Sequence, residues 1–398
     1  MTRSLALGLV TVTLLVACDP IPHPEVTVRE AAGSGVRFQL LSGDGNHVVV
    51  QAAGPGATVP GPGWWRVDRR DGSVVALPDA SRATRVSRDG SRVLLEQIAG
   101  GPIVLWADGT VLTPPGGARF SDDLTFAVFV DADGTVKTWE TATQAVAPVE
   151  PAFPRPPGTT AATAKGISDD GRTVQYTLSS AAPIERFVDL DAGLAVDRPN
   201  QTSLGGGQFD DRFVLAANGD AFIHVHQTID FDPSSWAELV ALPGGQSGRR
   251  FDNLTTTGQL ITGDPLIAAN GKVGWIYTDF RERCEDFPFP VPCTRASTAV
   301  AILANGYRTF DTGPNPLVSK DISAHGRFLV FDKRIEPADH FLIPRGPVRV
   351  IDWVTGTVEF LSQGSPSLTI DGQISDDQRL VATTTNDGGW YEYAAAPT

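Results

Sequence analysis

The stretch from Ile167 to Tyr176 recurs in modified form along the whole chain and limits the folds that the chain can adopt. Its centre is Asp170-Gly171, and an Asp or Asn followed by Gly supplies the positive backbone dihedrals of a tight reversal. The Val and aromatic residues that follow prefer a pleated strand, and the hydroxyl of Ser168 can bond free amides of the turn. Each copy is therefore predicted to form a strand, a turn and a second strand.

Copies of this stretch occur at a regular interval. They recur about every 48 residues, close to the roughly 40 to 50 residues of a four-stranded propeller blade. The pattern is degenerate, because Leu124 and Gln378 replace the Gly in two copies, and Ala216 and Ala268 replace the Ser in two others. The eight copies begin at Leu41, Val86, Phe120, Ile167, Leu215, Ile267, Ile322 and Ile374.

A second signal follows several copies, where a predicted third strand ends in an aromatic residue such as Trp106, Trp139 or Trp353. A Ser-x-Asp-Gly turn followed by a third strand that ends in Trp resembles the WD-repeat-like propeller repeat of TolB-type periplasmic proteins. The resemblance covers nearly all of the mature chain. It implies an all-β fold, a single propeller of four-stranded blades. We expect eight blades, with seven as the alternative; the resemblance implies no particular function, because propellers host many activities.

The last copy is followed by a third strand at Trp390 to Tyr393, and few residues remain after it. We therefore expect Val26 to Glu30 to supply the missing fourth strand and to close the ring, which removes an exposed sheet edge. Residues 26–398 then form one propeller, with no segment left for another domain. The abundant Gly (41) and Pro (30) fit an all-β chain with many turns.

Residues 1–17 have the pattern of a signal peptide, in which Arg3 precedes an apolar run that is too short for a permanent membrane helix. Leu15-Val16-Ala17-Cys18 resembles the bacterial lipobox, in which the Cys is lipidated. The alternative is an ordinary signal peptide with an incidental Cys. Residues 18–25 contain three prolines and are predicted to be an extended tether. We expect an extracytoplasmic lipoprotein of the cell envelope, attached to the membrane only through Cys18.

The net charge and the two remaining cysteines limit the classes of partner that we expect and the redox state of the compartment. The net charge is −14 and Lys and Arg form no cluster, so nucleic acid is excluded as an expected partner. Cys284 and Cys293 are predicted to form a disulfide, because close cysteine pairs in exported proteins usually do. Two free thiols, and a metal site with two Cys ligands, are the alternatives.

Three segments interrupt the repeat between the expected second and third strands, namely 228–235, 279–297 and 332–346. These connections are expected on one face of the disc, and loops on a rigid scaffold often carry binding residues. Sequence drift in unconstrained loops is the alternative. The aromatic and charged residues of the two longer insertions are the candidate binding residues: Phe280, Arg281, Arg283, Phe287, Phe289, Arg334, His340 and Phe341.

Catalytic and metal motifs are weak in this sequence. His224 and His226 are two apart on a predicted strand and point the same way, but no third ligand can be nominated, which favours a structural role. Asp131 and Asp133 imitate the later part of a calcium loop whose first ligand position is apolar. Arg249 replaces the final Gly of a nucleophile elbow. We therefore nominate no catalytic residue and expect no cofactor.

Two functions remain. The first is a monomeric, non-enzymatic scaffold that binds a protein or another cell-envelope component through the insertions. The alternative is an enzyme or a glycan-binding propeller with its site in the central channel. A deep central pocket with converging carboxylates or His favours the alternative, and a broad apolar patch beside a shallow channel favours the scaffold.

Overall fold

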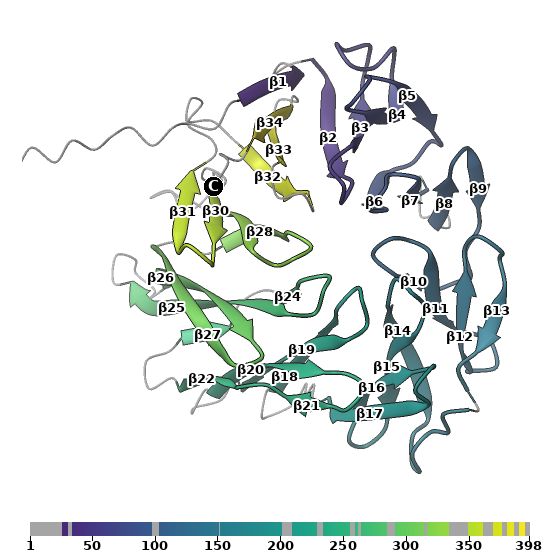
Figure 1. Cartoon of the computed structure of the whole chain (residues 1–398), viewed down its shortest axis with the longest axis vertical. Coiled ribbons are helices and arrows are strands. Elements are labelled where there is room, and N and C mark those ends of the chain that lie inside the picture. Colours follow the sequence, from purple (N-terminus) through teal and green to yellow (C-terminus); the bar gives the residue numbers. More distant parts are fainter. Residues whose placement is uncertain are drawn as a thin grey trace, which may run out of the picture.

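The computed structural model describes most of the chain as β-strands arranged in radial sheets around a central axis (Figure 1). The described residues are 26–30, 34–97, 103–150, 152–200, 209–228, 234–254, 259–261, 264–284, 291–313, 317–333, 349–360, 369–375, 380–385 and 390–394. Among these residues, no helix has the length and apolar character needed to cross a membrane. Residues 1–25, with the predicted signal peptide, Cys18 and the tether, lie outside the described residues.

The described strands form eight sheets, which we number as blades along the chain. Blade 1 contains β2 (Val36–Leu41), β3 (His47–Ala52), β4 (Gly63–Asp68) and β5 (Val74–Leu77). Blade 2 contains β6 (Arg82–Val86), β7 (Arg92–Glu96), β8 (Ile103–Ala107) and β9 (Thr110–Leu112). Blade 3 contains β10 (Arg119–Phe120), β11 (Phe126–Val130), β12 (Val136–Glu140) and β13 (Val146–Pro148). Blade 4 contains β14 (Ala161–Ile167), β15 (Thr173–Ser179), β16 (Ile184–Asp189) and β17 (Leu194–Pro199).

Blades 5 and 6 each contain one strand that is divided in two. Blade 5 contains β18 (Phe209–Leu215), β19 (Ala221–Thr228) and β20 (Ser234–Ala241), and both β21 (Gln246–Ser247) and β22 (Phe251–Leu254) pair with β20. In blade 6, β23 (Gln259–Ile261) and β24 (Leu266–Ile267) both pair with β25 (Val273–Cys284), which is followed by β26 (Val291–Leu303) and β27 (Gly306–Gly313). Blade 7 contains β28 (Leu317–Ile322), β29 (Phe328–Lys333), β30 (Arg349–Asp352) and β31 (Thr357–Phe360).

Blade 8 combines strands from the two ends of the described chain. It contains β32 (Thr369–Ile374), β33 (Leu380–Thr385), β34 (Trp390–Ala394) and β1 (Val26–Glu30). β1 pairs antiparallel with β34, and Val28 is opposite Tyr391. Blade 8 also contacts blade 1, because Gln373 accepts a hydrogen bond from the Leu41 N–H (2.7 Å) and donates one to the carbonyl of Gln39 (3.2 Å). The prediction of an all-β propeller with four-stranded blades is confirmed.

The hydrophobic core lies between blades. Val49 and Trp64 of blade 1 pack in one cluster with Val93, Leu95 and Trp106 of blade 2, and all five are buried. The second strands are therefore buried on both faces, as Val48, Val49 and Val50 show with no exposed surface. A single blade cannot bury its two apolar faces, so each sheet depends on its neighbours for stability.

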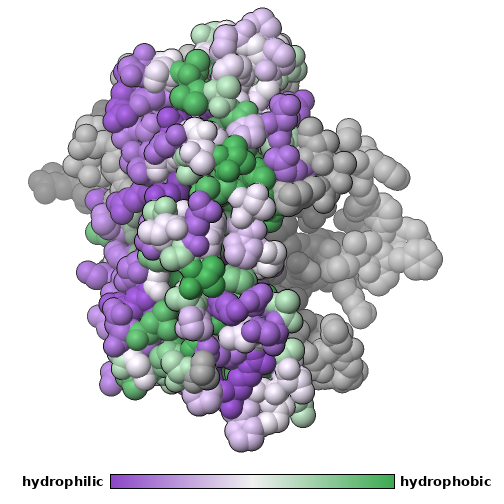
Figure 2. Space-filling model, turned by 90° about the vertical axis from the view of Figure 1, so that its right-hand side faces the viewer, coloured by the Kyte–Doolittle hydropathy of each residue, from purple (hydrophilic) through white to green (hydrophobic). Residues whose placement is uncertain are grey.

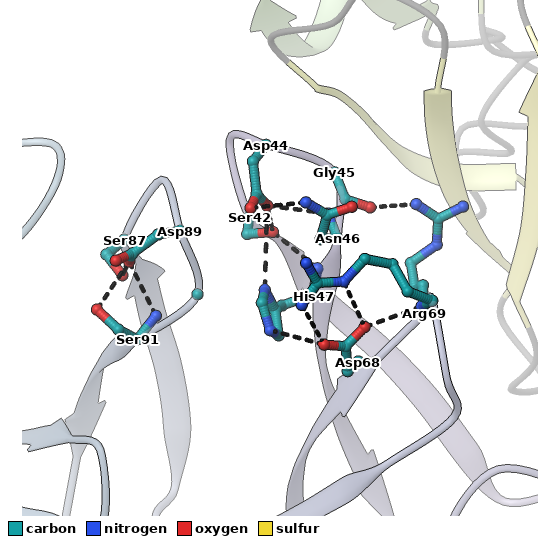
Figure 3. A network of polar contacts seen from close by, with 12 residues as sticks. Ser42, Asp44, Gly45, Asn46, His47, Asp68, Arg69, Ser87, Asp89 and Ser91 are labelled. Atoms are coloured by element: carbon teal, nitrogen blue, oxygen red, sulfur yellow. Dashed lines mark hydrogen bonds and ion pairs between the residues drawn. The ribbon is translucent and has the colours of Figure 1, made fainter.

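The Ser-x-Asp-Gly turns join the first and second strands and use one repeated hydrogen-bond pattern (Figure 3). In blade 1 the Ser42 hydroxyl donates to Asp44 Oδ1 (2.6 Å) and accepts from the His47 N–H (2.9 Å). Asp44 Oδ1 also accepts from the Asn46 N–H (2.9 Å). The bond from the Ser hydroxyl to the Asp recurs in blades 2, 3 and 4 at 2.7, 2.7 and 2.6 Å. The predicted strand, turn and strand unit is confirmed in these blades.

The Gly of a turn packs against the preceding blade. Gly90 of blade 2 has φ +71°, and a Cβ on it would lie 2.4 Å from the ring of His47 in blade 1. Gly219 of blade 5 has φ +74° and meets Thr173 of blade 4 in the same way, at 2.6 Å. Where Leu124 replaces this Gly, it keeps φ at 61° and is fully buried. The turns therefore connect successive blades as well as the strands of one blade.

Candidate functional site

The order of the strands defines two faces of the disc. The turns between first and second strands, and those between third and fourth strands, lie on one face, which we call the turn face. The connections between second and third strands lie on the opposite face, which we call the insertion face. The predicted insertions at 228–235, 279–297 and 332–346 connect β19 to β20, β25 to β26 and β29 to β30. All three are therefore connections of the insertion face, as the sequence predicts.

The segment 279–297 corrects the prediction of an inserted loop, because most of it is strand. β25 runs to Cys284 and β26 begins at Val291, so the two arms form a hairpin. From Arg281, which pairs with Thr294, to Cys284, the arms pair only with each other within the described chain. Arms of matching length let the backbone groups on either side bond each other across the hairpin. We call residues 281–284 with 291–294 the projecting ribbon.

The structure places only part of the predicted binding set. Phe280, Arg281 and Arg283 lie on β25, the last two within the projecting ribbon. The other five predicted residues are Phe287, Phe289, Arg334, His340 and Phe341, and they lie outside the described residues. The structure therefore brings three of the candidates onto one strand and leaves their relation to the others untested.

The two cysteines are on opposite arms of the same hairpin. Cys284 pairs with Val291, and Cys293 pairs with Glu282, so the cysteines are two residues out of register. Diagonal neighbours in an antiparallel pair are roughly 7–8 Å apart, which is longer than the usual Cα separation across a disulfide. The disulfide stays a prediction, and it requires the pairing near the end of the hairpin to shift along the ladder.

His224 and His226 contact one carboxylate of blade 5. His224 Nε2 lies 3.0 Å and His226 Nδ1 lies 2.7 Å from Asp211 Oδ1, and the other ring nitrogen of His224 lies 3.7 Å from Glu238 Oε1. Burial lowers the pKa of His224, but the bonds with Asp211 and Glu238 outweigh this effect and raise it. No group of three residues suited to a metal ion occurs within the described ranges. Asp211 thus links β18 to β19, and His224 also approaches β20 through Glu238.

Asp131 and Asp133, the weak calcium candidates, surround a lysine. Lys137 Nζ bonds Asp131 Oδ2 and lies 3.8 Å from Asp133 Oδ2. The hydrogen bond from Lys137 and that from the Ala132 N–H lower the pKa of Asp131. The ammonium group of Lys137 thus offsets part of the negative charge of the two carboxylates. The segment that carries them is the turn between β11 and β12.

A cavity of about 380 Å³ is lined by residues of blades 4 and 5 and by Asp264 and Pro265. Three carboxylates reach it, those of Glu185, Asp211 and Asp264. Glu185 is 1% exposed and already accepts hydrogen bonds from Gln175 (2.6 Å), Thr177 (2.7 Å) and Asn200 (3.0 Å). Much of the hydrogen-bonding capacity of the cavity wall is therefore used inside the protein.

The outer edge of the disc on the side of β9 and β13 carries small apolar patches separated by hydrophilic residues (Figure 2). Ile103, Val111 and Val146 are among the exposed apolar side chains, at 39%, 50% and 52%. Single exposed apolar residues are normal on a soluble protein. This edge does not present one broad apolar surface.

The sequence did not reveal a groove that lies on the turn face between blades 5 and 6. Its cationic residues come from three separate segments, so no spacing in the sequence connects them: Arg249 follows β21, Lys272 precedes β25, and Arg308 lies on β27. Trp353 also lines this groove, although its sequence pattern predicts only the end of a third strand. The one signal in the sequence is that each of these cations stands close to a Gly-containing turn.

Comparison with known proteins supports the fold and gives no family. No protein-family model matches the chain, and no curated protein sequence matches it. Among solved structures, the Dos1 propeller is similar over 94% of this chain and 95% of that one, with 11% identity and a TM-score of 0.52. The β-propeller domain of Cps50 (Swd1) from Myceliophteria thermophila covers 94% of this chain and 100% of its own, with 10% identity and a TM-score of 0.42. Hydrazine synthase from Kuenenia stuttgartiensis has 12% identity and a TM-score of 0.42, over 92% of this chain and 96% of that chain. The chain thus has a β-propeller fold.

Proposed function

We propose that this propeller is a non-enzymatic scaffold that binds a protein or another component of the cell envelope, and that a lipid on Cys18 holds it at a membrane. The observation that carries the binding proposal is the projecting ribbon on the insertion face. Its two arms pair with each other and with no third strand of the described chain. A two-stranded ribbon leaves backbone donors and acceptors on its outer edges, which a partner strand can pair with.

The charge of the ribbon supports a protein partner. Arg281 and Arg283 lie on one arm of a hairpin that belongs to a chain with net charge −14. Arginine and aromatic residues are enriched among the residues that dominate binding energy at protein interfaces. The rest of the disc supports the ribbon as a rigid base, since the sheets are packed against one another through buried side chains.

Crosslinked capture from the native envelope tests the scaffold. The bait is the mature chain, and the comparison is a variant in which residues 281–294 are replaced by a short Gly-Ser turn. Loss of specific partners from the variant is the expected result. Removal of Gly116, an exposed residue of the connection between β9 and β10 that lies outside the repeated turn motif, provides a control for general disturbance. Equal capture by the ribbon variant and the mature chain would remove the ribbon from the binding surface.

The lipid anchor is tested separately by Cys18→Ala. The variant is expected to leave the membrane fraction and to stay in the soluble extracytoplasmic fraction, because it carries no lipid and its apolar leader is too short for a permanent membrane helix. A variant that remains with the membrane would contradict the lipoprotein proposal, whatever the ribbon binds.

A second candidate function is a glycan-binding or catalytic propeller, and the cavity beside Glu185 favours it. That cavity places Lys165, Arg212 and three carboxylates around one space, and sugar sites combine such donors and acceptors. Its volume of about 380 Å³ is near the lower end of the roughly 300 to 1,000 Å³ of small-molecule sites. Calorimetric titration with mono- and disaccharides, compared with Glu185→Gln, tests this function. Heat of binding that is lost in the variant would support it.

A further inference from the structure

A second surface on the disc has the shape and charge of a ligand site. A groove of about 1400 Å³ lies on the turn face between blades 5 and 6 and reaches blade 7. Leu239, Ala241 and Leu303 contribute apolar surface to it, and the turn at Ala304 to Gly306 lies along it. This groove faces away from the projecting ribbon, because it is formed by turns of the opposite face.

Three cations line the groove between blades 5 and 6. Arg249, Lys272 and Arg308 are exposed, and none forms an ion pair with a carboxylate of the described chain. Asp220 is the acidic residue of the described lining, and Arg172 of blade 4 already binds it at 2.6 Å. An excess of free positive charge in one groove is unusual for a chain whose net charge is −14.

Arg308 is held in place by contacts across the boundary between blades 6 and 7. Its guanidinium lies over the ring of Trp353, 5.5 Å from the centroid. Its Nη1 donates to the carbonyls of Trp353 (3.0 Å) and Val354 (3.3 Å). These contacts fix the plane of the guanidinium and leave its other N–H groups for a further acceptor. Arg308 therefore holds its positive charge in a fixed position where the groove reaches blade 7.

Exposed apolar side chains stand beside these cations. Tyr307 is 42% exposed and contacts the ring of Phe251 edge to face at 4.8 Å, and Val354 is 50% exposed. A ligand in the groove thus meets both positive charge and apolar surface. Volumes above the roughly 300 to 1,000 Å³ of small-molecule sites suit an extended chain better than a single small anion.

We propose that this groove binds an extended acidic peptide segment of a partner protein. Carboxylates of the segment pair with Arg249, Lys272 and Arg308, and its apolar side chains contact Tyr307 and Trp353. A polyphosphate backbone carries more negative charge per unit length than such a peptide, so a molecule with net charge −14 repels it more strongly. The peptide also gains from the apolar contacts, which phosphate groups cannot make.

Fluorescence anisotropy on the full mature chain tests the proposal with a defined probe. The probe is a fluorescein-labelled ten-residue peptide of alternating Glu and Leu, which spans roughly 33–36 Å when fully extended. The variant carries Arg249→Gln, Lys272→Gln and Arg308→Gln. We expect its affinity to fall about tenfold, as the loss of three exposed charge pairs predicts. Binding by the unaltered chain is expected to weaken as salt increases.

A matched control separates the groove from the total charge. Arg37, Arg82 and Arg119 are exposed on β2, β6 and β10, away from the groove, and their triple replacement by Gln changes the net charge equally. This control is expected to bind like the unaltered chain, and therefore about tenfold more tightly than the groove variant. The proposal is overturned if both triple variants lose affinity equally, if the probe with Lys in place of Glu binds as tightly, or if single-stranded DNA of similar length binds more tightly. Replacement of the projecting ribbon leaves probe binding unchanged, so this site and the ribbon can fail independently.

Discussion

At the scale of single residues, the turn motif combines two requirements that the sequence shows only in part. The Ser and Asp side chains satisfy backbone amides inside one turn, as in Ser42 and Asp44. The Gly is needed for its positive φ and also because the preceding blade leaves no room for a Cβ. The first requirement is local and could be predicted. The second depends on how blades stack, which local sequence does not show.

The steric role of Gly219 gives the first prediction. Gly219→Ala is expected to destabilise the protein by about 2–4 kcal/mol, because a left-handed backbone costs an L-residue about 1 kcal/mol or more and crowding costs about 1–3 kcal/mol in addition. Gly72→Ala is the matched control, since Gly72 has φ +73° and open space around its Cα. Thermal unfolding followed by circular dichroism compares the two. Equal decreases in Tm would show that only the dihedral matters.

Asp169 gives a pH-dependent prediction. Burial, together with repulsion from Asp123 and Asp122, raises the pKa of Asp169 to about 7. The folded state then binds more protons than the unfolded state between about pH 4 and pH 7, so the contribution of this group to stability falls as the pH rises through that window. Asp169→Asn keeps an acceptor for the Asp123 N–H (2.9 Å) and removes the buried charge.

The expected outcome is a higher Tm for Asp169→Asn than for the unaltered chain at pH 8, with a difference that shrinks toward pH 4. Asp191→Asn, at an exposed position of blade 4, removes the same charge without the burial. If Asp191→Asn raises the Tm at pH 8 by the same amount, the effect belongs to the net charge of −14 and Asp169 has no special role.

At the scale of elements, the sequence predicts the presence of a strand better than its length. Short hairpins with a Gly turn have a strong local signal, so β14 and β15 were found from the residues around Asp170. The segment from Asp279 to Ser297 was predicted as a loop because it interrupts the repeat, yet its arms pair as strands. A strand that extends past its blade has no repeat to match, so periodicity cannot find it. The groove was missed for a related reason, since Arg249 and Lys272 belong to different connections and Arg308 lies on β27.

The cysteines of the projecting ribbon give a prediction at this scale. Peptide mapping by mass spectrometry under non-reducing conditions is expected to find Cys284 joined to Cys293, since exported proteins oxidise close cysteine pairs. The bond would contribute about 2–3 kcal/mol by closing a loop of about ten residues. It would also show that the register near Cys284 shifts from its pairing with Val291. Free thiols in the folded protein would agree with the described register and contradict the disulfide.

At the scale of the whole molecule, stability depends on packing between neighbouring blades. Consecutive blades from 1 to 7 share buried apolar clusters, as the cluster of Val49, Trp64 and Leu95 shows between blades 1 and 2. Blade 8 takes β1 from the beginning of the described chain and β34 from its end. The pairing of β1 with β34 could be expected from the sequence, because the last repeat lacks a fourth strand of its own. The activity could not be predicted in the same way, because the sites on the two faces are assembled from residues of different blades.

The last prediction concerns β1. A chain that begins at residue 31 lacks β1 and leaves β34 as an open edge, whereas a chain that begins at residue 26 lacks only the leader and the tether. We expect the shorter chain to unfold at a clearly lower temperature and to aggregate more readily, because the pairing of Val26 to Glu30 with β34 is lost and an unpaired edge invites association. Circular dichroism and size-exclusion chromatography measure both effects.

Val28→Pro in the longer chain, which removes one backbone donor opposite Tyr391, should give a smaller decrease in the unfolding temperature. Equal unfolding temperatures for the chains that begin at residues 26 and 31 would mean that β1 adds nothing to the stability of the ring, and that packing between the faces of blades 7, 8 and 1 alone holds the circle together.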